Sequence, residues 1–453
     1  MKKVLIANRG EIALRIIKTC KRLGIETIAV YSEADEDMPF VQEADVAFLI
    51  GPPPVQQSYL KSDVILEIAV REGVDAIHPG YGLLSENAEF ARQTEAAGIK
   101  FIGPDADTII KMGDKIGSRV TMQTAGVPVV PGTNEGIASL DDAIHAASEI
   151  GYPIMLKASA GGGGIGMVRC EDEQALVQHF DSVKNRAKAY FGDDIVFLEK
   201  FIANARHIEV QVFGDDAGNV VHLFERNCSV QRRNQKVIEE SPSPQLPEET
   251  RKNLHLAAVD AAKAVGYKNA GTVEFIVDEN NEIYFLEMNT RLQVEHPVTE
   301  EVTGYDLVEW QIEIAKGNNL PVVKQADIKS NGHAIEFRIY AEDPVKFMPS
   351  PGPINKLDWG NTDGVRIDSG YLAGGKVAPY YDPLISKVII HSATREEAIE
   401  KSKTFFSGVE IEGLRTNIPL FNEFLDSEAF RSGDYTTAVL AEWFEKQKEE
   451  QLK

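Results

Sequence analysis

The chain has 453 residues, 43% of them hydrophobic and 26% charged, and carries a formal net charge of -23 at pH 7. This length exceeds what one hydrophobic core can organise, so we expect a globular protein of two or three domains. The negative charge argues against nucleic acid and anionic membranes as partners, and no apolar run approaches the roughly 20 residues that a membrane span needs.

The first 126 residues alternate apolar runs with amphipathic helical patterns, as in VLIAN, TIAVY, VDAIHP and IKFIG. Such alternation predicts a doubly wound parallel sheet, similar to that of dinucleotide-binding domains. Asp35 or Glu33 lies at about the right distance to bind a ribose. However, Gly10 stands alone where three glycines are needed for close approach to a pyrophosphate, so the sequence does not predict NAD binding.

Two prolines in VPVVPG (127–132) mark a domain boundary. The next unit contains a helix from Leu140, the strand YPIMLKAS, a glycine run and a helix from Glu173. From there on the sequence is strand-rich, with one helix between Pro247 and Gly266 and another at 306–316. We therefore expect a mixed α/β and α+β protein whose N-terminal parallel sheet (1–126) is followed by a small lid (127–203) and a mixed-sheet C-terminal domain (204–453).

Residues 157–167 read KASAGGGGIGM, which cannot be the interior of a helix or strand because glycine loses so much conformational freedom there. A mobile surface loop is one interpretation. The strands expected on both sides favour another, a hairpin-like loop whose N–H groups cover phosphates while Lys157 adds a charge. A near-match to a P-loop, GYLAGGK at 370–376, fails because Val377 replaces the metal-binding hydroxyl and Pro379 blocks the following helix.

The segment GTVEFIVDENNEIYFLEMNTR predicts two strands around a turn at 278–281. If the loop has two or four residues, Glu274 and Glu287 point to the same face of the hairpin, one step diagonal to each other. Asn289 follows on that face. A loop of three residues would break this register. Acids this close repel unless a cation lies between them. The set indicates a Mg²⁺ or Mn²⁺ site, and the alternative is a solvent-facing acidic pair.

The segment that follows, RLQVEHPVTE, carries polar or charged side chains at every second position: Arg291, Gln293 and Glu295. In an extended stretch all three point the same way, beside the expected metal. A guanidinium suits a small carboxylate-like anion, and a glutamate next to it can act as a general base.

Seven blocks of the chain together resemble the biotin carboxylases of the ATP-grasp superfamily. They are IHPGYGLLSENAEFA (77–91), MGDK (112–115), the glycine loop, FLEKFI with RHIEVQ, ERNCSVQRRNQK (225–236), FLEMNTRLQVEHPVTE and AEDP (341–344), and the match runs from residue 3 to about 440. The resemblance implies a three-domain ATP-grasp fold in a homodimer, with the glycine-loop domain as a lid over the nucleotide.

The resemblance also implies site residues, motif by motif. For ATP they are Lys115, Lys157, Gly163, Gly164, Met167, Glu199, Lys200, Phe201, Ile202, His207, Gln231, Asn234, Glu274, Ile276 and Glu287. Two metal ions would be held by Glu274, Glu287 and Asn289, bicarbonate by Lys236, Arg291, Gln293 and Val294, and biotin by Tyr81, Gly82 and Arg338. The catalytic residues would be Lys236, Arg291, Glu295 and Arg338.

Two positions depart from the family pattern. Many members have histidine where this chain has Asn234, and arginine is common where it has Ile165. Cys228 lies in a motif block, but no activating pair near it in the sequence supports a nucleophilic role.

The implied reaction is the ATP-dependent carboxylation of biotin, in which bicarbonate is first activated as carboxyphosphate. It would be the first half-reaction of acetyl-CoA carboxylase, which forms malonyl-CoA for fatty acid synthesis, with carboxyltransferase subunits as partners. We expect biotin on a separate biotin carboxyl carrier protein, because no Met-Lys-Met tripeptide occurs here and no room for such a domain follows residue 446.

A cytoplasmic location is expected, because the N-terminal run lacks a signal-peptide cleavage site and the three cysteines form no CxxC pattern. The alternative functions are another ATP-grasp ligase with a different acceptor, a subunit of another biotin-dependent carboxylase, and a non-catalytic nucleotide-binding subunit.

Overall fold

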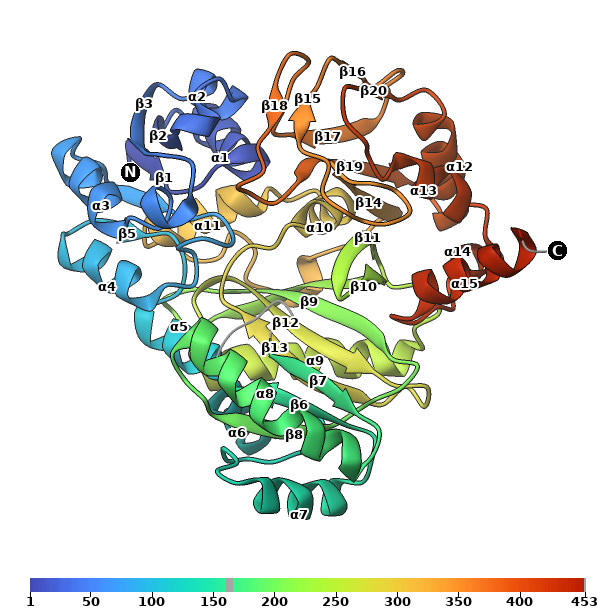
Figure 1. The fold of residues 1–453 in the computed structure, drawn as a ribbon. Coiled ribbons are helices and arrows are strands. Elements are labelled where there is room, and N and C mark those ends of the chain that lie inside the picture. The colour runs from blue at the N-terminus through green and yellow to red at the C-terminus, as the bar shows by residue number, and fades with distance from the viewer. Residues whose placement is uncertain (160–165, 452–453) are drawn as a thin grey trace.

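The computed structural model describes residues 1–159 and 166–451 (Figure 1). Its N-terminal part is a five-stranded parallel sheet in the order β3-β2-β1-β4-β5, as the alternating pattern predicts. The strands are β1 (Lys3–Ile6), β2 (Glu26–Ser32), β3 (Val46–Gly51), β4 (Ala76–His78) and β5 (Lys100–Phe101), and the helices are α1 (Gly10–Arg22), α2 (Pro39–Glu43), α3 (Ser62–Arg71), α4 (Ala88–Ala96) and α5 (Ala106–Gly113).

Asp35 has a structural role in this sheet. Its carboxylate accepts hydrogen bonds from Arg9 Nε and Nη2, both at 2.7 Å, and from the Tyr59 hydroxyl. Its charge is thus neutralised inside the fold, which agrees with the absence of a dinucleotide fingerprint.

The second unit is a small three-stranded antiparallel sheet, β7-β6-β8, covered by two helices. It comprises α7 (Leu140–Ile150), β6 (Ile154–Ala158), β7 (Met167–Cys170), α8 (Glu173–Phe191) and β8 (Val196–Lys200), and α6 (Lys115–Thr124), which precedes it, packs on β13 (Ile283–Asn289) and α9 (Glu248–Ala264). Lys157 pairs directly with Met167 across β6 and β7, so the strands that flank the glycine run form a hairpin, as expected. Gly163, Gly164 and Ile165 lie outside the described residues.

The centre of the molecule is an eight-stranded antiparallel sheet in the order β13-β12-β9-β10-β11-β14-β19-β17 (Figure 1). Its strands are β9 (Arg206–Gly214), β10 (Val220–Arg232), β11 (Gln235–Ser241), β12 (Asn269–Val277), β13 (Ile283–Asn289), β14 (His333–Tyr340), β17 (Val365–Ser369) and β19 (Leu384–Ser392). Helix α9 (Glu248–Ala264) packs Leu254, Ala258 and Ala261 on this sheet. Helices α10 (His296–Thr303) and α11 (Leu307–Ala315) follow β13.

The remaining elements are two short helices of the N-terminal part and the strands and helices that complete the C-terminal part. They are η1 (Glu33–Asp35), η2 (Val55–Gln57), η3 (Gln325–Asp327), the strand pairs β15 (Gly352–Pro353) with β18 (Lys376–Val377) and β16 (Lys356–Asp358) with β20 (Glu410–Glu412), and helices α12 (Arg395–Phe406), α13 (Ile418–Phe424), α14 (Glu428–Ser432) and α15 (Val439–Gln451). The P-loop-like stretch at 370–376 leads into strand β18 and not into a helix, which confirms that it is not a P-loop. Within the described residues, no helix combines the length and apolar character required to cross a membrane.

Candidate active site

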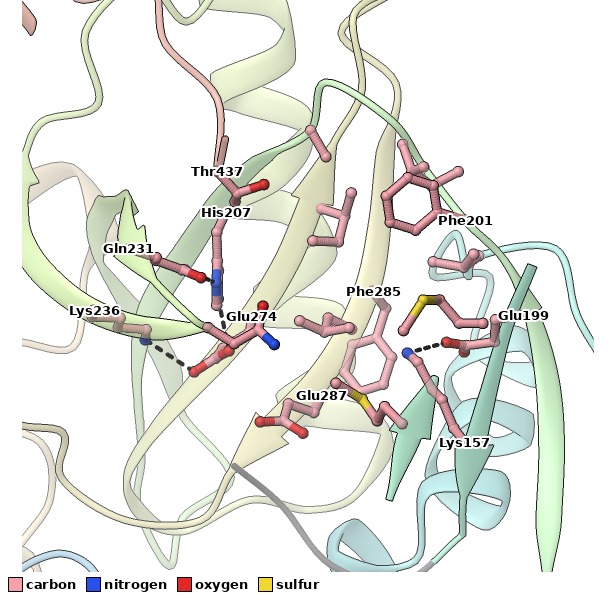
Figure 2. Close-up of a pocket in the computed structure, with 18 of the residues that line it drawn as sticks. Lys157, Glu199, Phe201, His207, Gln231, Lys236, Glu274, Phe285, Glu287 and Thr437 are labelled. Atoms are coloured by element: carbon pink, nitrogen blue, oxygen red, sulfur yellow. Dashed lines mark hydrogen bonds and ion pairs between the residues drawn. The ribbon is translucent and has the colours of Figure 1, made fainter. Parts of the chain in front are cut away.

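A pocket of about 600 Å³ lies between the lid sheet and the eight-stranded sheet (Figure 2). All but four of the site residues named from the sequence line it. Gly163 and Gly164 are outside the described residues, and Tyr81 and Gly82 are not among the lining residues. The pocket also takes Thr437 and Ala438 from the segment before α15, which sequence motifs did not indicate.

The lid side of the pocket carries two lysines. Lys157 on β6 pairs with Glu199 on β8, whose other oxygen accepts a hydrogen bond of 3.2 Å from Arg119. Lys115 is the first residue of α6, and Asp114 caps that helix through the N–H of Ile116. Burial lowers the pKa of Lys115 despite the opposing charge of Glu287. A buried ammonium group without a full counter-ion favours an anion such as a phosphate.

The carboxylate pair is formed by a bulge that the sequence did not reveal. Residues 278–282 connect β12 and β13, and the turn itself has three residues (279–281), because the N–H of Asp278 bonds to the carbonyl of Glu282 and Val277 pairs with Ile283. That loop alone would place Glu287 out of register. A bulge between the pairs Phe275–Phe285 and Glu274–Glu287 corrects the register by one residue.

Glu274 and Glu287 are therefore directly opposite each other, and not one step diagonal as predicted. Figure 2 shows both carboxylates on the same side of the strands. Burial and the charge of Glu274 raise the pKa of Glu287. Within residues 1–159 and 166–451, no side chain donates a hydrogen bond to Glu287, so this carboxylate is free to bind a cation from the pocket.

Glu274, in contrast, accepts several hydrogen bonds. Asn289 and Gln293 donate to Oε1 at 2.8 and 2.7 Å, Lys236 lies 3.3 Å from the same oxygen, and His207 lies 2.7 Å from Oε2. Although burial opposes it, the charges of Lys236 and His207 hold the pKa of Glu274 well below its ordinary value. The oxygens of Glu274, Glu287 and Asn289 are hard ligands at one place, which fits Mg²⁺ or Mn²⁺.

A second ionic group lies deeper in the pocket. Lys236 Nζ is 2.5 Å from Glu295 Oε1 and 2.7 Å from Glu209 Oε2, and Arg338 Nη2 is 3.0 Å from Glu295 Oε2. Burial acts to raise the pKa of Glu295, but the charges of Lys236 and Arg338 outweigh it and lower that pKa. Glu295 is thus ionised, and an anion bound beside these cations would compete for them.

Arg291 is oriented by a residue from the N-terminal part, in the segment between β4 and α4. Its Nε lies 3.0 Å from Glu86 Oε2, and its Nη2 donates to Asn289 Oδ1 at 2.8 Å. Glu86 also accepts from the N–H of Thr290 at 3.1 Å. Sequence reasoning missed Glu86, although it belongs to the block 77–91 that carried the resemblance.

Arg226 is a second residue that the sequence reasoning missed. It is fully buried, and its guanidinium contacts Glu209 at 2.6 Å and donates to Gln293 Oε1 at 2.9 Å. Its place in the block 225–236 was the available signal. Arg226 holds Gln293 so that the amide N–H group of Gln293 points to Glu274.

Tyr81 lies near the pocket but does not line it. Its hydroxyl donates to Glu11, whose carboxylate is 3.2 Å from Lys387 Nζ. Burial and the charge of Glu11 raise the pKa of Tyr81, whereas the charge of Arg338 acts to lower it. Arg338 is therefore close enough to Tyr81 to interact with it electrostatically. The Tyr81 backbone is held by Asn8 Nδ2, which donates to the Tyr81 carbonyl at 2.8 Å.

Two other features complete the pocket. Arg233 and Asn234 form the two-residue turn between β10 and β11, both at positive φ (49° and 64°). Asparagine tolerates this left-handed conformation better than most residues do, which gives a local reason for Asn234. Cys228 lies 3.9 Å from Glu295, and burial raises its pKa well above the ordinary value; the structure gives no support for a nucleophilic thiol.

A pocket enclosed between two antiparallel sheets, with ammonium groups on the lid and paired carboxylates below, is the arrangement of an ATP-grasp ligase. Three family models match the chain: "Biotin carboxylase, N-terminal domain" over residues 1–109, "Carbamoyl-phosphate synthase L chain, ATP binding domain" over 114–323 and "Biotin carboxylase C-terminal domain" over 336–442. The chain belongs to the biotin carboxylase family, and the activity of that family is the ATP-dependent carboxylation of biotin.

Individual relatives agree with this membership. The chain is 56% identical to "Biotin carboxylase" of Halalkalibacterium halodurans, covering 97% of each chain, and 56% identical to "Biotin carboxylase 2" of Bacillus subtilis, covering 97% and 98%. The crystal structure of a biotin carboxylase–β-γ-ATP complex from Campylobacter jejuni matches with a TM-score of 0.95 at 46% identity, covering 97% and 98%. The biotin carboxylase domain dimer of Hydrogenobacter thermophilus 2-oxoglutarate carboxylase, in complex with MgADP, ADP and bicarbonate, matches at 0.94 and 48%, covering 97% of each chain.

Proposed function

We propose that this pocket activates bicarbonate with ATP and transfers the carboxyl group to biotin on a separate carrier protein. The carrying observation is that one pocket holds the lid lysines, the carboxylate pair and the group of Lys236, Glu295 and Arg338. The first two suit a nucleotide with its metal, and the third suits a small anion. Residues 127–203, with the glycine run, act as a lid over the nucleotide.

Bicarbonate is a poor electrophile and must first be phosphorylated by ATP. Lys236 and Arg291 hold the anion, with Gln293 and the backbone at Val294, and Glu295 accepts its proton as its hydroxyl oxygen attacks the γ-phosphorus. Glu295 becomes a stronger base on binding, because the anion takes over part of the positive charge that lowers the pKa of Glu295.

A divalent metal ion on Glu274, Glu287 and Asn289 supplies charge neutralisation for the phosphate oxygens when bound. Lys115 and Lys157 approach the phosphates from the lid. The strand segment Glu199–Ile202, with His207, Gln231, Asn234, Ile276 and Met167, surrounds the rest of the nucleotide. Carboxyphosphate then releases CO₂ and phosphate, and the phosphate takes the proton from the ureido nitrogen of biotin. Arg338, with Tyr81 and Gly82 close by, stabilises the resulting ureido anion, which attacks CO₂.

We propose that the chain is a subunit of acetyl-CoA carboxylase, which forms malonyl-CoA for fatty acid synthesis. We also propose that this subunit works as a homodimer. Identity is 51% to 56% with chains named biotin carboxylase, against 49% with a pyruvate carboxylase component of Methanothermobacter thermautotrophicus and 48% with "2-oxoglutarate carboxylase small subunit" of Hydrogenobacter thermophilus. A pull-down from the source cells tests this: we expect a biotin carboxyl carrier protein and acetyl-CoA carboxyltransferase subunits. Recovery of subunits that act on pyruvate or 2-oxoglutarate would contradict it.

The purified protein should release ADP from ATP only when bicarbonate and a divalent cation are present, and free biotin should increase the rate. Chelation of the metal should lower the rate at least ~10²-fold, because the phosphate charge is then unneutralised. ADP release and carboxybiotin formation measured in parallel check this. ADP release that ignores both bicarbonate and biotin but responds to another carboxylate or amine would indicate a different ATP-grasp ligase.

The purified protein should carry no covalent biotin, since the sequence contains no Met-Lys-Met tripeptide. Mass spectrometry and a streptavidin blot should find the unmodified mass and no signal, while a co-purifying carrier serves as the positive control. A biotinylated peptide from this chain would overturn the proposal of a separate carrier.

A further inference from the structure

Two glutamates behind Arg338 are not used by the mechanism above. Glu239 on β11 and Glu336 on β14 are direct cross-strand neighbours, and Arg338 and Lys387 are direct neighbours across β14 and β19. All four side chains therefore point to the same face of the sheet. Three of them are fully buried and Arg338 is 8% exposed.

The cations on this face are already paired with other groups. Arg338 contacts Glu239 through Nε at 2.6 Å and Glu295 through Nη2 at 3.0 Å. Lys387 Nζ donates to the carbonyl of Val294 at 2.8 Å and lies 3.2 Å from Glu11. Neither cation bonds to Glu336.

Among the described residues, both oxygens of Glu336 and Oε2 of Glu239 are buried without a hydrogen-bond partner. Helix α10, which covers this face, packs Val298 and Val302 with Ala334 and Ile389, and its buried His296 interacts electrostatically with Lys387. The charged groups that act on Glu336 are Lys387, Glu239, Arg338 and Glu295. Three unpartnered carboxylate oxygens in one dry layer would be strongly destabilising if both groups were ionised.

We propose that Glu239 and Glu336 share one proton and form a carboxyl–carboxylate pair, which positions Arg338 and leaves its charge available for the pocket. Directly opposite residues have Cβ atoms roughly 5 Å apart, so two glutamate side chains can meet and share a hydrogen bond. The shared proton gives Oε2 of Glu239 and one oxygen of Glu336 a partner. The pair then carries one negative charge and not two.

The direction of the pKa shifts agrees with this. Burial raises the pKa of Glu336 well above its ordinary value, and burial raises the pKa of Glu239 to about 7. In the pair, the neutral partner is Glu336, because Glu239 has the guanidinium of Arg338 beside it. Ionised Glu336 would add a third carboxylate around Arg338 and oppose both bicarbonate and the biotin anion. This consequence for Arg338 rests on the proposed function, whereas the shared proton does not.

The decisive variant is Glu336→Gln, which keeps the shape and the neutral state but has no proton to lose. A carboxyl group with a raised pKa in the folded state costs stability increasingly as pH rises above its unfolded pKa of about 4.3. The Tm of the wild type should therefore fall more steeply from neutral to alkaline pH than that of E336Q, which should be the more stable protein there. The control is Glu410→Gln, whose side chain is 58% exposed and which should follow the wild type.

Two further readouts separate the shared proton from the proposed role of Arg338. The infrared spectrum of the wild type should contain a protonated-carboxyl band at neutral pH that E336Q lacks, and its presence does not depend on biotin chemistry. Carboxylation by E336Q should stay within about twofold of the wild type at neutral pH and decline later as pH rises. Equal Tm slopes and no carboxyl band would overturn the shared proton. A ~10²-fold loss of carboxylation in E336Q at neutral pH, with the band and slopes as expected, would overturn only the link to Arg338.

Discussion

Replacing Glu295 with alanine should abolish both bicarbonate-dependent ATP cleavage and biotin carboxylation, by ~10²–10⁴-fold, as expected when a general base is lost. Replacing Arg338 with glutamine should remove most of the carboxylation, ~10²–10³-fold, and leave much of the ATP cleavage, now uncoupled. The measurement is ADP release and carboxybiotin formation in parallel on each variant. The reason is that Glu295 acts on bicarbonate first, whereas Arg338 acts on the biotin anion afterwards.

The contact between these two residues adds a pH effect to the Arg338 variant. Because the charge of Arg338 helps to lower the pKa of Glu295, that pKa should rise in R338Q. Residual ATP cleavage should then decline at a higher pH on the acid side than in the wild type. Arg415→Gln, with a side chain 71% exposed, is the matched control and should change neither activity. Equal loss of both activities in R338Q would show that Arg338 serves the nucleotide or the fold.

Glu274→Gln and Glu287→Gln should each lower ATP turnover by at least ~10²-fold, because each removes a metal ligand. Their stabilities should differ. The pKa of Glu287 is raised, so its charge is unfavourable at neutral pH without metal, and E287Q should melt at or above the wild-type temperature. The pKa of Glu274 is lower in the folded protein than in the unfolded chain. Its ionised carboxylate therefore stabilises the fold at pH values above the unfolded pKa, and this stabilisation is lost only in acid.

E274Q should therefore be destabilised by roughly 3 kcal/mol at neutral pH, since it removes one of the buried carboxylates that neutralise Lys236. Thermal and urea unfolding with and without Mg²⁺ measure this, and Mg²⁺ with ATP analogue should stabilise the wild type but neither variant. Glu282→Gln, exposed on the same hairpin, is the control. Normal ATP turnover in either glutamine variant would contradict the metal site.

The contacts of the two carboxylates explain why the stabilities of the two variants should differ. In the sequence, the two glutamates are equivalent members of an acidic pair. In the structure, Glu274 is the member of the pair that contacts Lys236 from β11 and His207 from β9, and such contacts between separate strands cannot be read from the hairpin itself.

The amino-acid sequence by itself determined the elements and the residues that form the site. The apolar alternation predicted the parallel sheet, proline and glycine marked the bounds of α9 and α11, and all but four of the residues that the motif blocks named line the pocket. These signals are local, because helical and strand periodicity and caps act over a few residues.

Only the tertiary structure decided how those residues meet. The bulge beside Glu287, and not the hairpin loop, sets the register of the carboxylate pair, and a bulge leaves little trace in one strand's sequence. Arg291 is oriented by Glu86, 205 positions away, and Glu239 faces Glu336 because β11 pairs with β14 across a long connection. These contacts depend on which strands pack together in the fold. The energy of a buried charge is set by its neighbours in space, and the local sequence does not determine those neighbours.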